Sequence, residues 1–101
     1  MYEIEYLLSH VSEEVLLEQL AEEAAELAHA ALKLKRALYG GNPTPITKTM
    51  AMEALVEELA DMGLCRSLVI EALQIDRGAI SDKRREKLHR WARRLVHETD
   101  T

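Results

Sequence analysis

The chain has 101 residues, enough for one small domain, and we expect 1–101 to fold as a single domain. Its net charge of −5 makes nucleic acid an unexpected partner, and no apolar run approaches the length needed to span a membrane. One cysteine excludes a disulfide framework, and the acidic N-terminal segment lacks the basic start of a signal peptide, so we expect a cytoplasmic protein.

The first predicted element is a short helical or irregular lead-in over residues 1–11, followed by a long helix. Ser12, with two acids after it, is a suitable helix cap, and the helix is expected to run to about Tyr39. Gly40 supplies a C-terminal stop. Residues 40–47 contain both prolines of the chain, which predicts the loop between the first and second long helices.

Two further long helices are expected after this loop. Thr47 is a good cap for a helix over residues 48–73, and Asp76 can cap another over residues 77–97. No segment alternates polar and apolar residues as a strand does. The sequence therefore predicts an all-α fold, a helical bundle of three long helices. Because three helices leave one side uncovered, we expect homo-oligomerisation to complete the bundle.

Each of the first two long helices has an apolar seam interrupted by one glutamate. These are Glu23 and Glu58, and a second acid follows each of them three residues later, at Glu26 and Asp61. If the seams pack together, four carboxylates converge, and burying unpaired charge is costly. A hard cation such as Mg²⁺, or Mn²⁺ in its place, would offset that cost. The seams consist of Leu16, Leu20, Glu23, Leu27, Ala31, Leu34 and Leu38, and of Ala51, Leu55, Glu58, Met62, Cys65, Val69 and Ala72.

Two other interpretations of these acids stay open from spacing alone. They can pair with Lys or Arg of the third helix, since charge runs are mostly solvated faces. Glu26-x-x-His29 and Glu86-x-x-His89 also have the spacing found in di-iron helical bundles. Glu86 lies about 200° around its helix from Leu88, away from the apolar seam, which disfavours the di-iron interpretation.

The stretches EEAAEL (22–27) and EELADM (57–62) resemble the MazG-like all-α nucleotide pyrophosphohydrolases, whose signature is ExxE on one helix and ExxD on the next. The resemblance extends over roughly residues 16–95. It implies that Glu23, Glu26, Glu58 and Asp61 bind Mg²⁺ ions that hold the triphosphate of a nucleotide. Water then attacks, and the products are a nucleoside monophosphate and pyrophosphate.

The same resemblance implies further roles. Glu23 and Glu22 would be catalytic, with Glu22 orienting water, and homodimers or tetramers are usual in the family. Lys87, Arg90 and Arg94 lie three or four residues apart on one helix face, where the family places phosphate-binding residues. Alternatively this face is simply solvated, or it pairs with the acidic first helix.

A non-catalytic helical oligomerisation or interaction module is the main alternative function. In that case the seam acids would confer pairing specificity, as buried polar residues sometimes do. Trp91 is expected in the core or at an interface. Cys65 is expected to be a buried seam residue and not a nucleophile, because no histidine is placed to activate it. The sequence leaves the preferred base and sugar, and the number of metal ions, open.

Overall fold

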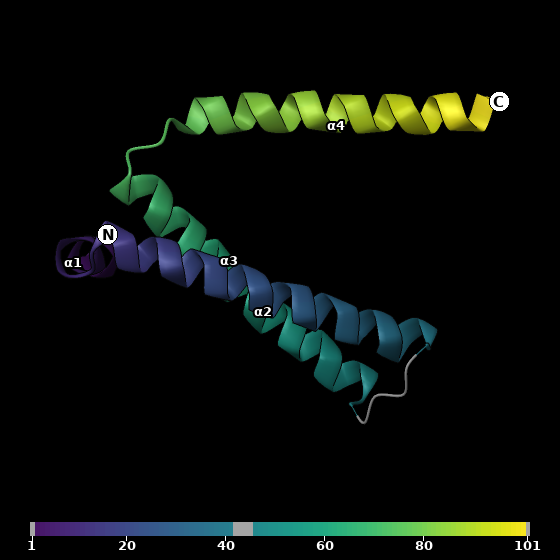
Figure 1. Ribbon diagram of the computed structural model, residues 1–101, viewed down its shortest axis with the longest axis horizontal. Coiled ribbons are helices and arrows are strands. Elements are labelled where there is room, and N and C mark those ends of the chain that lie inside the picture. The colour runs from purple at the N-terminus through teal and green to yellow at the C-terminus, as the bar shows by residue number, and fades with distance from the viewer. Residues whose placement is uncertain (1, 42–45, 101) are drawn as a thin grey trace.

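The computed structural model describes residues 2–41 and 46–100, and every regular element in those ranges is an α-helix. The helices are α1 (Tyr2–His10), α2 (Glu13–Tyr39), α3 (Lys48–Ala72) and α4 (Arg77–Asp100), as Figure 1 shows. The predicted all-α class is confirmed, and the lead-in is helical. None of the helices in the described ranges combines the length and apolar character needed to cross a membrane.

The helix ends follow the capping signals of the sequence. The Ser12 hydroxyl accepts a hydrogen bond from the Val15 N–H at 3.2 Å, and the Thr47 hydroxyl does the same for Met50 at 3.1 Å. Gly40 ends α2 with a φ of 81°, a left-handed value that favours glycine. Residues 42–45 of the predicted loop lie outside the described residues.

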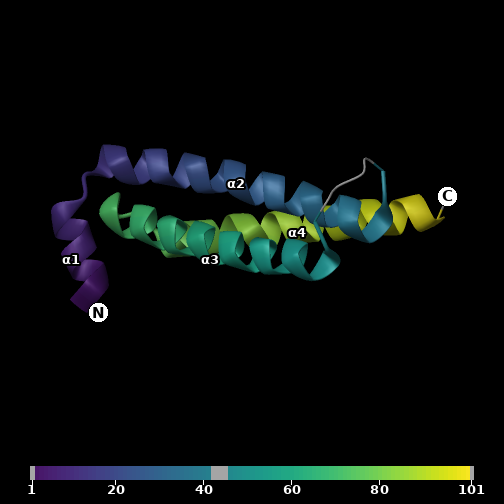
Figure 2. The same cartoon turned by 90° about the horizontal axis from the view of Figure 1, so that it is seen from below.

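The core lies between α2 and α3, which run antiparallel and side by side along most of their length (Figure 1). Helix α1 lies across the end of this hairpin where α2 begins and α3 ends (Figure 2). There the apolar side chains of α1 pack against Leu16, Leu68 and Val69. Among the residues whose burial the structure describes, the buried apolar ones are Leu16, Ala30, Leu34, Ala51, Leu68, Val69 and Ile70.

Helix α4 is not part of this core. Every side chain from residue 81 to residue 98 is exposed, including Trp91 at 67 %. The radius of gyration is 17.7 Å, whereas a compact domain of this length has a value of about 13 Å. Three long helices are present as predicted, but within one chain they form a hairpin with an outlying helix, not a three-helix bundle.

The direction of α4 is fixed by short-range bonds at its junction with α3. Gln74 has a φ of 53°, and the next amide, Ile75 N–H, donates back to Ile70 O at 3.0 Å, which closes α3 in a left-handed cap. Asp76 then caps α4 by accepting from the Gly78 N–H at 2.9 Å. Arg77 donates to Glu71 across the turn at 2.7 Å. These bonds, and not packing, set where α4 points.

Candidate metal centre

Three acids meet where the middle of α2 faces the middle of α3. Glu23 and Glu58 are half-buried in the helix–helix contact, and Asp61 is exposed one turn further along α3. One oxygen from each lies within 4.8 Å of the others, and we call these residues the three-carboxylate cluster. Two oxygens on opposite sides of an Mg²⁺ ion are about 4.2 Å apart. A small side-chain rotation would therefore bring the cluster to ligand spacing.

The Glu58 carboxyl is the most perturbed member of the cluster. Its Oε2 atom is buried and has no hydrogen-bond partner. Burial raises the pKa of Glu58 above its ordinary value of 4.5, and the charges of Glu23 and Asp61 raise it further, as do a hydrogen bond with Glu23 and the charge of Glu26. Every neighbour acting on this pKa is itself an acid. The ionised cluster is thus unfavourable in the absence of a cation.

The donor set fits a hard divalent cation. All three ligand candidates are carboxylates, which suit Mg²⁺ and Mn²⁺. Within the described part of the chain, no Lys or Arg forms an ion pair with Glu23, Glu58 or Asp61. The pairing of these acids with basic residues of the third helix, which the sequence left open, therefore does not occur within one chain.

The other two predicted acids of α2 lie at the margin of this cluster. Glu26 is exposed, and it is near enough for its charge to raise the pKa of Glu58. It is outside the three-carboxylate cluster, and a change of side-chain rotamer would be needed for it to share a cation. Glu22 is also exposed, and it points about 100° around α2 from Glu23. Its role in orienting water stays a prediction.

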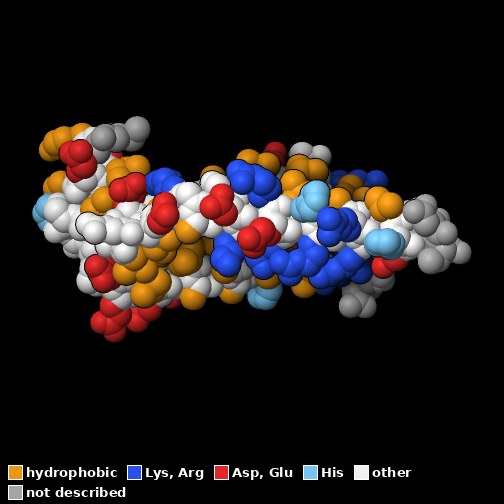
Figure 3. Space-filling view, turned by 90° about the horizontal axis from the view of Figure 1, so that it is seen from above, with side chains coloured by type: hydrophobic (Ala, Val, Ile, Leu, Met, Phe, Trp, Pro, Cys, Tyr) orange, Lys and Arg blue, Asp and Glu red, His pale blue; other side chains and the backbone are white. Residues whose placement is uncertain are grey.

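The predicted phosphate-binding residues lie together, but on α4. Lys87, Arg90 and Arg94 line a shallow hollow with Trp91. Figure 3 shows Lys and Arg side chains gathered in a band along α4. Because α4 does not pack on the hairpin, this band is not brought to the three-carboxylate cluster of the same chain. The exposed Glu86 and His89 also lie on α4, so the di-iron arrangement is not assembled either.

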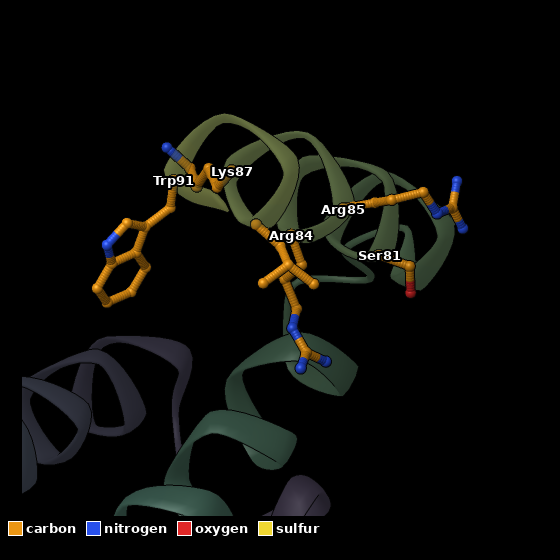
Figure 4. Close-up of a pocket in the computed structure, with 6 residues that line it drawn as sticks. Ser81, Arg84, Arg85, Lys87 and Trp91 are labelled. Carbon is orange, nitrogen blue, oxygen red and sulfur yellow. The ribbon is translucent and has the colours of Figure 1, made fainter. Parts of the chain in front are cut away.

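A second hollow on α4 was not anticipated from the sequence. It is lined by Ser81, Arg84, Arg85, Lys87, Leu88 and Trp91. In Figure 4 the side chains of Arg84 and Trp91 point toward the side on which the hairpin lies, while Arg85 points away from it. The relevant sequence signal was the position of Arg84 between Ile80 and Leu88, each four residues away on the same helix face.

Cys65 is half-buried on α3 beside the cluster. Burial raises the pKa of its thiol, and the charges of Glu23 and Asp61 raise it further. A thiol with a raised pKa is protonated at neutral pH and is a poor nucleophile. Cys65 is thus partly buried in the seam, not fully buried as predicted, and its lack of a nucleophilic role stays a prediction.

Comparison with known proteins identified no relative of this chain. No protein-family model matches the sequence, and searches of curated proteins and of solved structures found no similar chain. The inference of function therefore rests on the two acidic motifs and on the geometry of the cluster they form.

Proposed function

We propose that this protein is a metal-dependent nucleoside triphosphate pyrophosphohydrolase, which converts an NTP or dNTP and water into the monophosphate and pyrophosphate. The observation that carries the proposal is the three-carboxylate cluster, in which the Oε2 atom of Glu58 is buried and has no hydrogen-bond partner. The likeness of residues 22–27 and 57–62 to the MazG-like signature supplies the reaction class.

The acids of α2 and α3 have distinct roles in this proposal. Glu23, Glu58 and Asp61 hold a divalent cation, Mg²⁺ or Mn²⁺, and Glu26 joins them from the margin of the cluster. The bound cation neutralises phosphate charge and activates water, which is the main chemical requirement of phosphoryl transfer. Glu23 and Glu22 act on water, with Glu22 accepting a hydrogen bond that orients it.

The basic residues of α4 supply the remaining charge. Lys87, Arg90 and Arg94 neutralise the phosphates of the substrate from the side opposite the acids. Because α4 lies apart from the cluster in a single chain, this role requires either movement of α4 or a second chain. The active form in this proposal is a homodimer or tetramer.

Pyrophosphate release across the common ribo- and deoxyribonucleoside triphosphates, with Mg²⁺ present, tests the proposal. Glu58→Gln and Asp61→Asn should each lower the rate by at least about 100-fold, since losing groups that merely support a metal ligand costs about 10- to 100-fold. Glu3→Gln removes the same charge from an exposed position on α1, away from the cluster, and serves as the control. No pyrophosphate release from the wild type with any substrate would refute the enzymatic function.

A non-catalytic interaction module remains the second candidate, because one structural observation favours it. Leu88 and Trp91 of α4 are 68 % and 67 % exposed, as expected for a helix that binds another protein surface. The two functions differ in their response to metal. An interaction module would form a defined oligomer, hydrolyse no nucleotide and show no thermal stabilisation by Mg²⁺.

A further inference from the structure

Helix α4 carries an apolar stripe that nothing in the described part of its own chain covers. Leu88 and Trp91 lie three residues apart on one face, with Arg84 one turn before Leu88. All three side chains are exposed. In proteins most helical stability comes from packing of an apolar face rather than from helix propensity, and the 24 residues of α4 lack such packing in the described part of the chain. The length and stripe of α4 therefore indicate a packing partner.

The junction described above keeps α4 away from its own hairpin. The left-handed Gln74, the return bond from Ile75 to Ile70 and the Asp76 cap together fix the turn. For α4 to fold down onto α2 and α3 of the same chain, these bonds and the Arg77–Glu71 pair would have to be rearranged. A partner from another molecule meets α4 without that cost.

The charge distribution identifies the kind of surface that fits. Residues 1–76 contain fourteen acidic and five basic side chains, a net charge of −9, whereas residues 77–101 contain eight basic and four acidic, a net charge of +4. Lys83, Lys87, Arg90 and Arg94, which we call the basic ridge, border the apolar stripe of α4. Pairing of two α4 helices would bring like charges together, which is unfavourable.

The hairpin has a complementary surface on one edge. Glu22 and Glu26 lie one turn apart on α2, and Glu57 and Asp61 lie one turn apart on α3; all four are exposed. Glu22 and Glu26 are displaced around α2 from Glu23 in the same sense as Glu57 and Asp61 are displaced around α3 from Glu58. Because the two helices run antiparallel with these glutamates facing each other, both pairs border the same side of the hairpin, which we call the acidic edge.

Apolar side chains accompany the acidic edge. Met50 and Leu64 on α3 are 56 % and 50 % exposed. They lie seven residues before and after Glu57, so all three share a helix face. The edge thus offers apolar contacts for Leu88 and Trp91 as well as charge for the basic ridge.

We propose that α4 of each chain packs on the acidic edge of a second copy, so that two chains exchange their C-terminal helices around a two-fold axis. The same two surfaces meet twice, which is the arrangement that closes a symmetric dimer. Two exchanged helices, each about 36 Å long and about 10 Å wide, would bury on the order of 1,400 Å² in total, within the range of stable interfaces.

The exchange would place the basic ridge of one chain beside the three-carboxylate cluster of the other. The cation and the phosphate-binding residues would then come from different chains, and each site would be incomplete in a monomer. This consequence rests on the proposed function, whereas the helix exchange itself does not.

Fluorescence of the single tryptophan, Trp91, reports directly on whether α4 becomes covered. As protein concentration rises, its emission should shift to shorter wavelength in step with dimer formation seen by sedimentation. Lys87→Glu with Arg94→Glu should move both transitions to higher concentration by at least about tenfold, because like charges would then meet. Arg94→Glu alone should also raise both transitions, whereas Arg93→Glu makes the same charge change about 140° around α4 from Leu88, outside both hollows, and should leave them within about twofold of the wild type.

Cross-linking between two differently tagged chains tests the surface that α4 meets. In a Cys65→Ser background, one chain carries Glu57→Cys and the other Lys87→Cys, and a short bismaleimide is added. The mixed-tag product should predominate, and moving the second cysteine from position 87 to 93 should reduce it several-fold.

A third protein carries Glu57→Cys and Lys87→Cys in the same chain. If only this protein cross-links, and only within one chain, or if the Trp91 emission is blue-shifted at every concentration, α4 packs on its own hairpin and the exchange is overturned. Monomers with exposed Trp91 at all concentrations would overturn it as well. Neither readout depends on hydrolysis, so these failures are distinguishable from failure of the proposed function.

Discussion

Replacing Glu58 by glutamine should change the thermal stability in opposite directions with and without a divalent cation. In chelator, the variant should melt at a higher temperature than the wild type, because it removes a charge that burial and three neighbouring acids disfavour. With Mg²⁺ at 100 times its dissociation constant, linkage stabilises the wild type by about 2.7 kcal/mol. For a chain of this size that corresponds to a rise in melting temperature on the order of 10–20 °C.

The variant should gain little from Mg²⁺, because glutamine puts a neutral amide in place of a carboxylate of the three-carboxylate cluster. The order of the two melting temperatures should therefore reverse on adding the cation. Far-ultraviolet circular dichroism during heating measures both transitions. Glu3→Gln should melt close to the wild type in both buffers, since Glu3 is exposed on α1 and outside the cluster. Equal stabilisation of wild type and Glu58→Gln by Mg²⁺ would refute the reasoning.

Three further predictions follow from burial and charge. In chelator, the wild type should gain stability relative to Glu58→Gln as pH falls from neutral toward 4.5. The reason is that the pKa of Glu58 is raised in the folded state, so the folded protein takes up a proton before the unfolded chain does. Melting temperatures of both proteins across this pH range measure the difference. Leu34→Ala should lower the free energy of unfolding by about 2–5 kcal/mol in urea titrations. The control Leu32→Ala, at a side chain that is 52 % exposed, should change it by at most about 0.5 kcal/mol. Equal losses in the two variants would contradict the hairpin packing. The Cys65 thiol should react with an aromatic disulfide more slowly than free cysteine at neutral pH. Asp61→Asn should speed this reaction, because it removes a charge that raises the pKa of the thiol. An unchanged rate in Asp61→Asn would show that the cluster does not affect Cys65.

The helix bounds were predictable because their signals are local. Ser12 and Thr47 supply capping hydroxyls, and Gly40 supplies the left-handed φ that ends α2. Each signal acts within about one turn and depends on no distant residue. The same is true of the start of α4, where Asp76 caps the first turn.

The meeting of Glu23 and Glu58 was predictable from their positions in two apolar seams, since packing those seams places the two acids opposite each other. The different positions of Glu26 and Asp61 relative to the cluster were harder to predict from the sequence. Glu26 has the same three-residue offset from Glu23 that Asp61 has from Glu58, yet only Asp61 joins the cluster. That difference depends on how α2 and α3 are rotated about their axes, and residue spacing alone does not fix that rotation.

The position of α4 was not predictable from its own residues. Its apolar stripe is narrow and contains Arg84, so the pattern indicates a packing face without identifying the partner. In this structure the turn at Gln74 directs α4 away from the hairpin of its own chain. A glutamine in the left-handed conformation is not predictable from the sequence, because glycine is the usual residue there. The expected three-helix bundle is therefore not formed within one chain in this structure, and its completion by a second chain stays a prediction.

Binding of Mn²⁺ measured by electron paramagnetic resonance tests most directly the central claim that the acids of α2 and α3 form a divalent cation site. Wild-type protein and the Glu3→Gln control should each reduce the signal of free Mn²⁺, and excess Mg²⁺ should restore it. Glu58→Gln and Asp61→Asn should leave most of the signal unchanged. Equal uptake of Mn²⁺ by the wild type and Glu58→Gln would contradict the assignment of the three-carboxylate cluster as the metal site.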